Sequence, residues 1–205
     1  MLNPDGVING NYRCSLAGCD LNRRWNKPSL TLHPTIYHTK KLIKSFAAER
    51  DLVLFVDFHG HSNKKDVFIY GCHNPDDPME TRLFPYLMGK LCPYFSFKKS
   101  RFGNQKSKET TARISLYKEL GLSNIFTMEA SFCGNQEGPY AGLHFTIDSL
   151  KTIGRDCCRS LLSYCEIPVP EEEIDPEEGE SCLGASEKAQ SRTILSPGVT
   201  PLPTS

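Results

Sequence analysis

The stretch that decides the fold is Leu52–Phe58, LVLFVDF, which runs directly into His59–Ser62, HGHS. A nearly unbroken apolar run of strand length predicts a strand buried on both faces, as in a parallel or mixed sheet covered by helices. Ligands bind at strand ends in such sheets, because the loops there open a crevice. Residues i and i+2 of a strand share a face, so His59 and His61 can point the same way. Taken alone, the motif indicates either a metal site or a pair of hydrogen-bonded turn histidines.

The segments on both sides of this strand alternate between helical and extended patterns. Strands are predicted over 66–72 and 124–132, and helices over 34–50, 79–91, 111–120 and from 143 to about 164. In the first helix, one face collects Ile36, Ile43, Phe46 and Ala47. The order of elements predicts an α/β domain with a mixed central sheet flanked by helices.

Composition excludes several classes of protein. Basic and acidic side chains number 24 each among 205 residues, which argues against binding to nucleic acid or to an anionic membrane surface. No window approaches the roughly 18 apolar residues of a membrane span, and the N-terminus lacks the features of a signal peptide. Nine cysteines without a CxxC pair predict free thiols in a reducing compartment.

The character of the chain changes after Ile167. Residues 1–167 carry the apolar patterns of a folded domain, whereas 168–205 begin with an acidic, proline-containing run and continue with a Ser/Pro-rich segment. Such a segment cannot bury enough apolar surface to offset its ordering entropy, so we predict a disordered tail. Its acidic run is read as a solvated charge block, with imitation of an acidic substrate as the alternative.

Two further groups of residues carry possible chemistry. Glu129 interrupts an apolar strand, where a carboxylate is costly unless it is paired or has a task. It is either a general base beside a metal-bound water or the partner of a structural arginine. Arg13, Asn22 and Arg23 cluster in a loop rich in turn residues. They suit a free C-terminal carboxylate, which arginine binds through two hydrogen bonds, unless the loop is simply a solvated basic surface.

Three blocks in order, NPDGVINGNYRCSLAGCDLNRRW (3–25), VDFHGHS (56–62) and FTMEASFCG (126–134), are very similar to the cytosolic carboxypeptidase branch of the M14 zinc metallocarboxypeptidases. The resemblance covers residues 3 to about 167. It implies a carboxypeptidase-like fold and a cytosolic enzyme, associated with microtubules or cilia, that removes C-terminal glutamates from protein tails. Acidic peptide tails, those of polyglutamylated tubulin among them, are the implied partners.

The resemblance also implies roles for individual residues. His59 matches the third zinc ligand, and Glu129 matches the glutamate that takes a proton from the attacking water and returns it to the leaving amine. Arg13 matches the arginine that polarises the scissile carbonyl. Asn22 and Arg23 match the pair that holds the terminal carboxylate of the substrate.

Other positions are assigned less fully. Arg113 lies where family members set the side-chain pocket, and a cation there suits a C-terminal glutamate; the alternative is that Arg113 braces its own helix. His61 is read as structural or as a support for the ligand. The lid tyrosine of secreted relatives is not assigned, although Tyr117 and Tyr140 are candidates.

The sequence departs from the family pattern in one respect. The first two zinc ligands of the family come from an HxxE motif, and no histidine here is followed by xxE; the closest imitation, His73–Asp76 (HNPD), is read as a turn. A catalytic zinc site needs about three protein ligands. We therefore expect an N-terminally truncated catalytic domain whose Zn²⁺ site is incomplete, with weak zinc binding and little peptidase activity of its own.

Two alternatives to an enzyme stay open at this point. The chain could be a non-catalytic module that recognises acidic tails through its arginines, which the missing HxxE motif favours. It could also be a redox-sensitive or structural protein that uses its cysteines.

Overall fold

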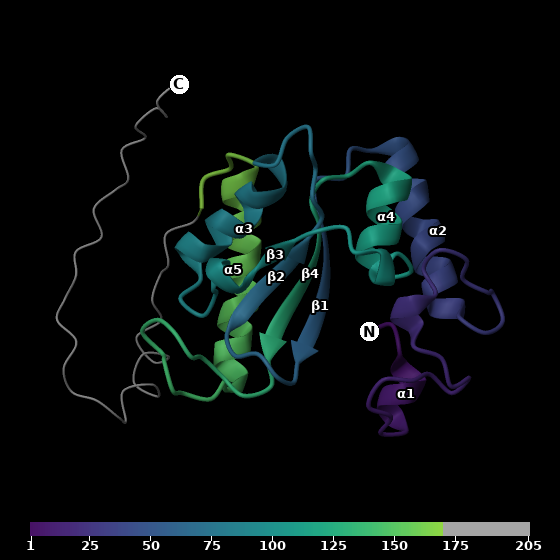
Figure 1. The fold of residues 1–205 in the computed structure, drawn as a ribbon, viewed down its shortest axis with the longest axis horizontal. Helices are drawn as coiled ribbons and strands as arrows, with labels where there is room; N and C mark the ends of the chain where they lie inside the picture. Colours follow the sequence, from purple (N-terminus) through teal and green to yellow (C-terminus); the bar gives the residue numbers. More distant parts are fainter. Residues whose placement is uncertain (170–205) are drawn as a thin grey trace. The chain divides into compact units, whose positions relative to one another are not determined.

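A four-stranded mixed sheet organises residues 1–169, the part of the chain that the computed structural model describes (Figure 1). The spatial order is β1 (Phe55–His61), β4 (Ile125–Ser131), β2 (Val67–Gly71) and β3 (Arg101–Phe102). β4 pairs in parallel with β1 and antiparallel with β2, and β2 pairs in parallel with β3. The predicted mixed sheet is confirmed. The predicted tail, 168–205, lies outside the described residues from 170 onward.

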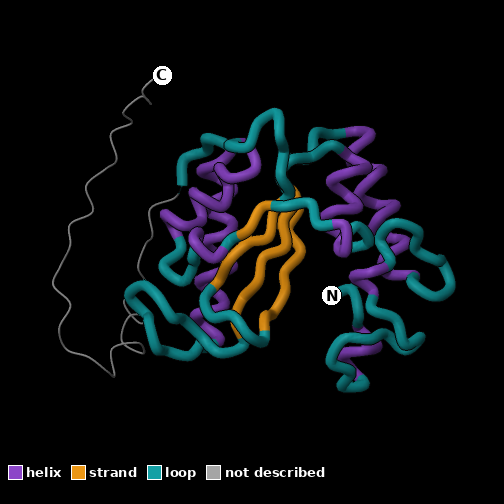
Figure 2. Tube along the Cα trace, viewed as in Figure 1, coloured by secondary structure: helices purple, strands orange, loops and turns teal. Residues whose placement is uncertain are grey.

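The four long helices confirm the predicted ones to within a few residues (Figure 2). They are α2 (Pro34–Glu49), α3 (Glu80–Leu91), α4 (Ala112–Leu120) and α5 (Ile147–Tyr164). A short helix, α1 (Pro4–Ile8), precedes them, and the side chain of Asn3 caps it by accepting the N–H of Gly6. Single 3-10 turns occupy Leu21–Arg23, Phe97–Lys99 and Lys106–Lys108.

Several smaller predictions can also be compared with the structure. Every cysteine in residues 1–169 is a free thiol, as expected. The His73–Asp76 segment is a turn, in which the side chain of Asn74 accepts the N–H of Asp76. Within the described part of the chain, no helix combines the length and apolarity needed to cross a bilayer.

Side-chain alternation divides the sheet into two faces with different partners. One face packs against α3 and α5, and the core between the sheet and these helices contains the buried residues Val67, Ile69, Phe84, Met88, Cys92, Phe126, Met128, Ile153 and Cys157. The other face packs against α2, α4 and the loop before them, through Leu21, Trp25, Ile36, Ala112, Leu116 and Ile125. This second core covers only the beginning of β1 and β4, which leaves the carboxyl ends of these two parallel strands uncovered by helices.

The predicted burial of the first strand on both faces is wrong. No residue of β1 is fully buried, and Phe58 is 64% exposed. Within the described residues β1 pairs only with β4, so it forms an edge of the sheet. β4, which has neighbours on both sides, is the strand that is buried almost throughout.

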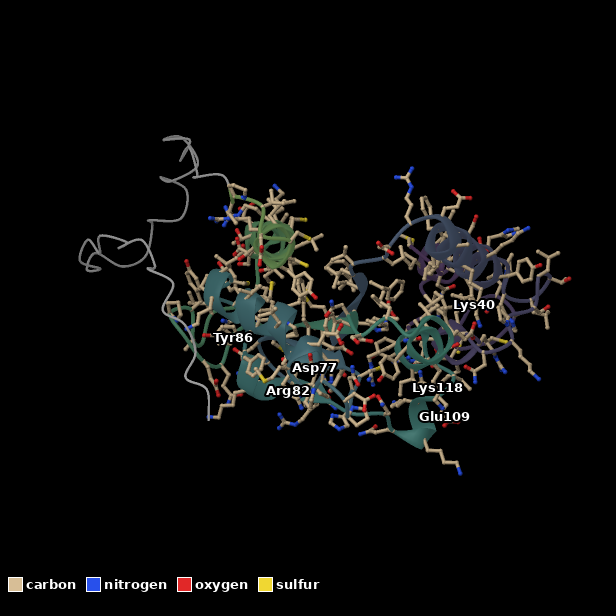
Figure 3. All side chains as sticks on the ribbon, turned by 90° about the horizontal axis from the view of Figure 1, so that it is seen from above. Lys40, Asp77, Arg82, Tyr86, Glu109 and Lys118 are labelled. Carbon is tan, nitrogen blue, oxygen red and sulfur yellow. The ribbon has the colours of Figure 1, made fainter. Side chains whose placement is uncertain are left out.

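The apolar face predicted for the first helix is partly wrong as well. Ile36 is buried and Ile43 packs against the core, but Phe46 and Ala47 are exposed. The position between the two packed residues is filled instead by Lys40, which is only 7% exposed (Figure 3). The first half of α2 therefore faces the core, and its last turns do not.

Lys40 joins three separate parts of the chain. Its ammonium donates to the carbonyl oxygens of Trp25 at 2.5 Å and Asn26 at 3.2 Å, and to a carboxylate oxygen of Glu119 at 2.5 Å. Glu119 in α4 also pairs with Lys44 at 2.6 Å. Because a buried ammonium is costly unless its donors are satisfied, these bonds fix the loop that ends in Trp25 against α2 and α4.

Gly134 provides a test of the close packing behind β4. A Cβ added there would lie 1.9 Å from the backbone carbonyl oxygen of Leu143, so Gly134→Ala forces two backbone segments apart. We expect the free energy of unfolding to fall by about 1–3 kcal/mol, the usual cost of overpacking. The measurement is the midpoint of urea unfolding.

The matched control is Gly154→Ala in the interior of α5, where nothing lies within 4 Å of the added Cβ. This variant should raise the free energy of unfolding by about 0.5–1 kcal/mol, because alanine favours helix over glycine. Equal destabilisation by both substitutions would contradict the close approach at Gly134.

Candidate active site

The register of two parallel strands brings two of the predicted residues together. In the pairing of β1 with β4, His59 stands directly opposite Glu129. Paired residues project from the same face of a sheet, and the period of two adds Asp57 to that face. Gly60 faces the other way, where a Cβ would lie 1.9 Å from the ring of Phe132. The glycine of the HGH motif therefore makes room for an aromatic ring behind the site.

A concave site of about 640 Å³ lies over these strand ends, and we call it the site hollow. Every residue to which the sequence assigned a role lines it: Arg13, Asn22, Arg23, His59, Arg113 and Glu129. The remaining lining residues are Tyr12, Gly60, His61, Ser62, Lys64, Tyr70, Arg101, Phe102, Gly103, Gln105, Lys108, Thr111 and Thr127. The fold thus gathers side chains from four separate segments of the sequence, within 12–23, 59–70, 101–113 and 127–129, at one place.

The imidazole of His59 is oriented by two neighbours. Its Nε2 lies 2.8 Å from a carboxylate oxygen of Asp57 and 3.4 Å from the side-chain nitrogen of Asn22. The hydrogen bond with Asp57 raises the pKa of His59, and burial of the ring opposes that rise. Asp57 therefore stabilises the protonated ring in this arrangement.

The carboxylate of Glu129 is held away from water. The residue is 9% exposed, and burial raises its pKa, while the nearby His59 and Arg13 act in the opposite direction. Among residues 1–169, Glu129 has no ion pair with an arginine within 4.0 Å, so the structural ion pair considered as an alternative is not seen there. A desolvated carboxylate with a raised pKa is well suited to accept a proton.

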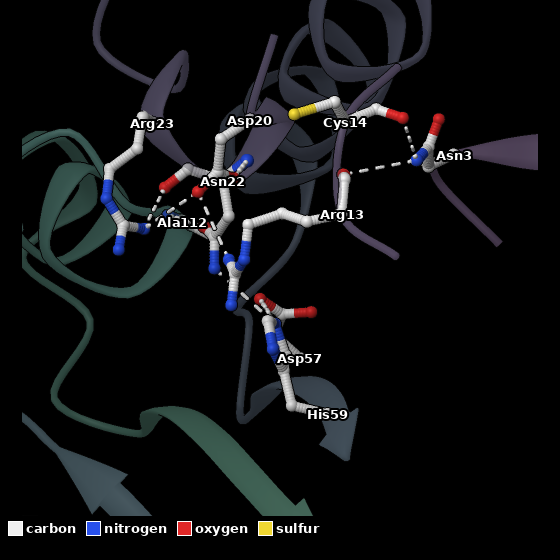
Figure 4. Close-up of polar contacts among 9 residues, drawn as sticks. All are labelled: Asn3, Arg13, Cys14, Asp20, Asn22, Arg23, Asp57, His59 and Ala112. Carbon is white, nitrogen blue, oxygen red and sulfur yellow. Dashed lines mark hydrogen bonds and ion pairs between the residues drawn. The ribbon is translucent and has the colours of Figure 1, made fainter. Parts of the chain in front are cut away.

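Asn22 links the site to helix α4 (Figure 4). Its side-chain oxygen accepts the backbone N–H of Ala112 at 2.9 Å, which fixes the direction of the amide. Its own backbone N–H donates to Asp20 at 3.0 Å. The side-chain nitrogen is thereby turned toward His59.

The two arginines of the early loop share one carboxylate (Figure 4). Arg13 donates to Asp20 at 3.1 Å, and Arg23 lies 3.9 Å from the same oxygen. Arg23 also donates to the backbone carbonyl of Asn22 at 2.9 Å. Both guanidinium groups keep further donors, so the loop can bind an additional anion in the site hollow.

Arg113 is largely occupied by backbone contacts. Its guanidinium donates to the carbonyl oxygens of Gly71 at 2.6 Å and Gly103 at 3.0 Å, and it lies 3.6 Å from the sulfur of Cys72. It is 8% exposed. These contacts agree with the alternative that Arg113 has a structural role. They attach it to the end of β2 and to the loop after β3, however, and not to its own helix.

His61 and the two candidate lid tyrosines contact backbone groups or other rings. The ring of His61 accepts the backbone N–H groups of Asn63 at 3.2 Å and Lys64 at 3.0 Å, a structural arrangement. Neither candidate for the lid tyrosine lines the site hollow. Tyr117 donates to the carbonyl of His73, and Tyr140 stacks on another ring.

Sequence reasoning missed several residues of the site hollow. The alternation of side chains along β2 is a signal for Tyr70. β2 is antiparallel to β4, and Tyr70 stands opposite Thr127, on the face of the site. Lys64, Arg101 and Lys108 come from a loop, a two-residue strand and a single 3-10 turn, where no periodicity predicts direction. They make the site hollow strongly positive, a property that the net charge of zero conceals.

The residues present do not by themselves fit a catalytic metal ion. No group of three or more histidine, cysteine, aspartate or glutamate side chains within residues 1–169 is arranged to hold one. His59 is the single imidazole placed beside carboxylates in the site hollow, whereas a catalytic zinc needs about three protein ligands. The described residues thus supply part of a ligand set.

Comparison with known proteins gives a consistent picture. A scan against protein-family models finds no match. The chain is 46% identical over 170 residues to cytosolic carboxypeptidase 2 of Xenopus tropicalis, and 44% identical over 186 residues to cytosolic carboxypeptidase 1 of Homo sapiens. These alignments cover 81% and 83% of the chain, but only 18% and 15% of those relatives.

The fold is also that of solved bacterial enzymes. A metallo-carboxypeptidase from Burkholderia cenocepacia matches with a TM-score of 0.70 at 21% identity. One from Pseudomonas aeruginosa, in complex with (2-guanidinoethylmercapto)succinic acid, matches with a TM-score of 0.70 at 24% identity. Each match covers 80% of this chain and 43% or 44% of the solved one, so the chain spans less than half of those structures.

The contact between Asp57 and His59 can be tested directly. In Asp57→Asn the carboxylate is removed while the size of the side chain is kept, so the pKa of His59 should fall relative to that of the unsubstituted chain. An NMR pH titration of the imidazole signals measures this change.

The pKa of His61 serves as the internal control, because it is lowered by burial and by Lys64 and owes nothing to Asp57. An unchanged His59 titration, or an equal change at His61, would show that the observed contact does not hold the ring in solution.

Proposed function

The chain belongs to the cytosolic carboxypeptidase branch of the M14 metallocarboxypeptidases, and from this premise we propose that it forms part of an enzyme that removes C-terminal glutamates from acidic protein tails. The observation that carries the proposal is the common site hollow of His59, Glu129 and the arginines of the early loop. We further propose that the enzyme acts in the cytosol, at microtubules or cilia, on polyglutamylated tubulin.

Glu129 is the proposed proton carrier. It takes a proton from the water that attacks the last peptide carbonyl, so that a C–O bond forms and a tetrahedral intermediate results. When the C–N bond breaks, Glu129 gives the proton to the leaving amine. Its low exposure and raised pKa support both transfers, because burial makes the carboxylate a better proton acceptor than a solvated one.

The arginines account for the position of the cut. Arg23, held by the carbonyl of Asn22, is the proposed partner of the terminal carboxylate, which makes the preceding peptide bond the one that reaches Glu129. Arg13 is proposed to stabilise the oxyanion of the intermediate. One donor of this kind is typically worth about 3–4 kcal/mol.

The charge of the site hollow supports an acidic substrate. Its lining contains Arg13, Arg23, Lys64, Arg101, Lys108 and Arg113, and Glu129 is the single acidic residue among them. We propose that Arg113 contributes to binding of a glutamate side chain, through guanidinium donors that its backbone contacts leave available. A neutral side chain would gain nothing from this positive field.

The metal is proposed on the grounds of the family alone. Zinc, when bound, supplies Lewis acidity that lowers the pKa of its bound water to about 7. Because the residues described here do not complete a ligand set, we derive no step from it, and we propose that the further ligands are residues other than 1–169. The same incompleteness favours a second candidate function, a non-catalytic module that binds acidic tails through the same arginines.

The proposed role of Glu129 is tested by Glu129→Gln in a longer product that supplies the remaining ligands. Loss of the proton carrier should lower kcat on a polyglutamate peptide by about 10²–10⁴-fold, with binding of the peptide unchanged. Release of glutamate over time measures kcat. Substantial residual turnover would remove Glu129 from this role, whereas binding without any turnover of the unsubstituted protein would favour the module.

The carboxylate site can be tested in the 205-residue chain itself. A glutamate peptide with a free C-terminal carboxylate should bind about tenfold more tightly than its C-terminal amide, as expected for a hydrogen bond to a charged group. Fluorescence anisotropy of an N-terminally labelled peptide measures both dissociation constants. Arg23→Met should abolish the difference between acid and amide.

Arg24→Met is the matched control, since the neighbouring Arg24 is exposed and does not line the site hollow. If Arg24→Met weakened the preference for the free carboxylate as much as Arg23→Met does, the assignment of Arg23 would be wrong.

A further inference from the structure

A second concave surface lies next to the site hollow, and we call it the basic hollow. It measures about 390 Å³ and is lined by Asn63, Lys64, Lys65, Lys99, Arg101 and Gln136. All of its charged lining residues are cationic. Lys64 and Arg101 line both surfaces, so the two hollows share a border.

The cations of the basic hollow are poorly compensated by acidic groups. Lys64 donates to the hydroxyl of Tyr70 at 3.1 Å, and Arg101 donates only to backbone carbonyl oxygens. The ammonium of Lys65 has no hydrogen bond or ion pair to another residue in the described chain. Among the four cations, Lys99 alone has a carboxylate partner, Asp66. An anion entering the basic hollow would therefore meet three cations, Lys64, Lys65 and Arg101, that have no carboxylate partner in the described residues.

Two lining residues of the basic hollow, Lys99 and Gln136, are held in place by the neighbouring Asp66. Asp66 is 1% exposed and has a positive φ of 71°. Its carboxylate accepts the backbone N–H groups of Gln136 at 2.7 Å and Glu137 at 3.2 Å and pairs with Lys99. Lys99 in turn donates to the side-chain oxygen of Gln136 at 3.0 Å. Because these side chains are already ordered, a ligand that contacts them meets a smaller entropy cost.

We propose that the basic hollow binds carboxylate side chains of an acidic peptide whose C-terminus occupies the site hollow. The inference rests on the proposed function and extends it from the terminal residue to the residues that precede it. An extended peptide advances about 3.3 Å per residue, so a run of glutamates leaving the site hollow past Lys64 and Arg101 enters the basic hollow next. Binding of one end then raises the effective concentration of the other.

The composition of the basic hollow favours a peptide over a nucleic acid. Its lining contains no aromatic ring on which a base could stack, and stacking is a principal contribution to binding of single strands. Asn63 and Gln136 add amide groups that can donate to carboxylates. Selectivity for acidic protein tails is the expected result.

The experiment compares a labelled peptide of two glutamates with one of six, each with a free C-terminal carboxylate, by fluorescence anisotropy on the 205-residue chain. The longer peptide should bind more tightly. Lys65→Glu should weaken binding of the six-glutamate peptide by about tenfold, as expected for loss of contacts with exposed cations and added repulsion. Binding of the two-glutamate peptide should stay within about twofold, because Lys65 does not line the site hollow.

The control is Lys41→Glu, the same charge reversal at an exposed lysine of α2 that lines neither hollow. It should leave both dissociation constants unchanged within about twofold, since distant exposed charges are screened. Lys65→Gln, which removes the charge without reversing it, should give a smaller loss in the same direction as Lys65→Glu. Since the Lys65 side chain is exposed and forms no bond in residues 1–169, neither variant threatens the fold.

The possible outcomes separate this inference from the proposed function. Equal affinity for the two peptide lengths, or an equal loss for both lengths in Lys65→Glu, overturns the inference even if the acid is still preferred to the amide. Equal binding of acid and amide, with the length effect and its loss in Lys65→Glu retained, overturns the carboxylate site instead. Binding of hexathymidylate as tight as that of the six-glutamate peptide would mean a general polyanion surface and would also overturn the inference.

Discussion

The register between β1 and β4 is the constraint on which the site depends. It sets His59 opposite Glu129, and a slip of one residue would turn one of them to the other face of the sheet. The register is held from behind, where Val56, Met128 and Ala130 pack into the core shared with α3 and α5. Apolar packing on one face thus determines the polar chemistry on the other.

Local pattern was sufficient to predict much of this arrangement. The HGH motif after an apolar run indicated a strand end, and the single carboxylate within 124–132 identified Glu129 as unusual. Local pattern could not predict the burial of β1, because apolar content reports the tendency to form a strand and not the number of its neighbours. The same limit applies to Lys40, whose partners Trp25 and Glu119 are brought to it only by the tertiary fold.

Electrostatics connects the two candidate functions. The cations that line the site hollow would attract an acidic tail whether or not a bond in that tail is cut. Turnover places an additional demand on the structure, because Glu129 must keep its desolvated position amid positive charge that favours its ionised form. The proposed recognition of acidic tails therefore needs only the residues described here, whereas the proposed hydrolysis needs further metal ligands as well.

The bonds made by Lys40 have an evolutionary consequence. The ammonium of Lys40 serves two backbone carbonyls and Glu119, so a neutral residue at position 40 would remove the donor to the buried carbonyl of Trp25 and one of the two lysine partners of Glu119. Replacement of either member of the pair should be accepted only together with a compensating replacement of the other. Positions 40 and 119, 79 residues apart in sequence, are accordingly expected to co-vary among homologues, although neither touches a substrate.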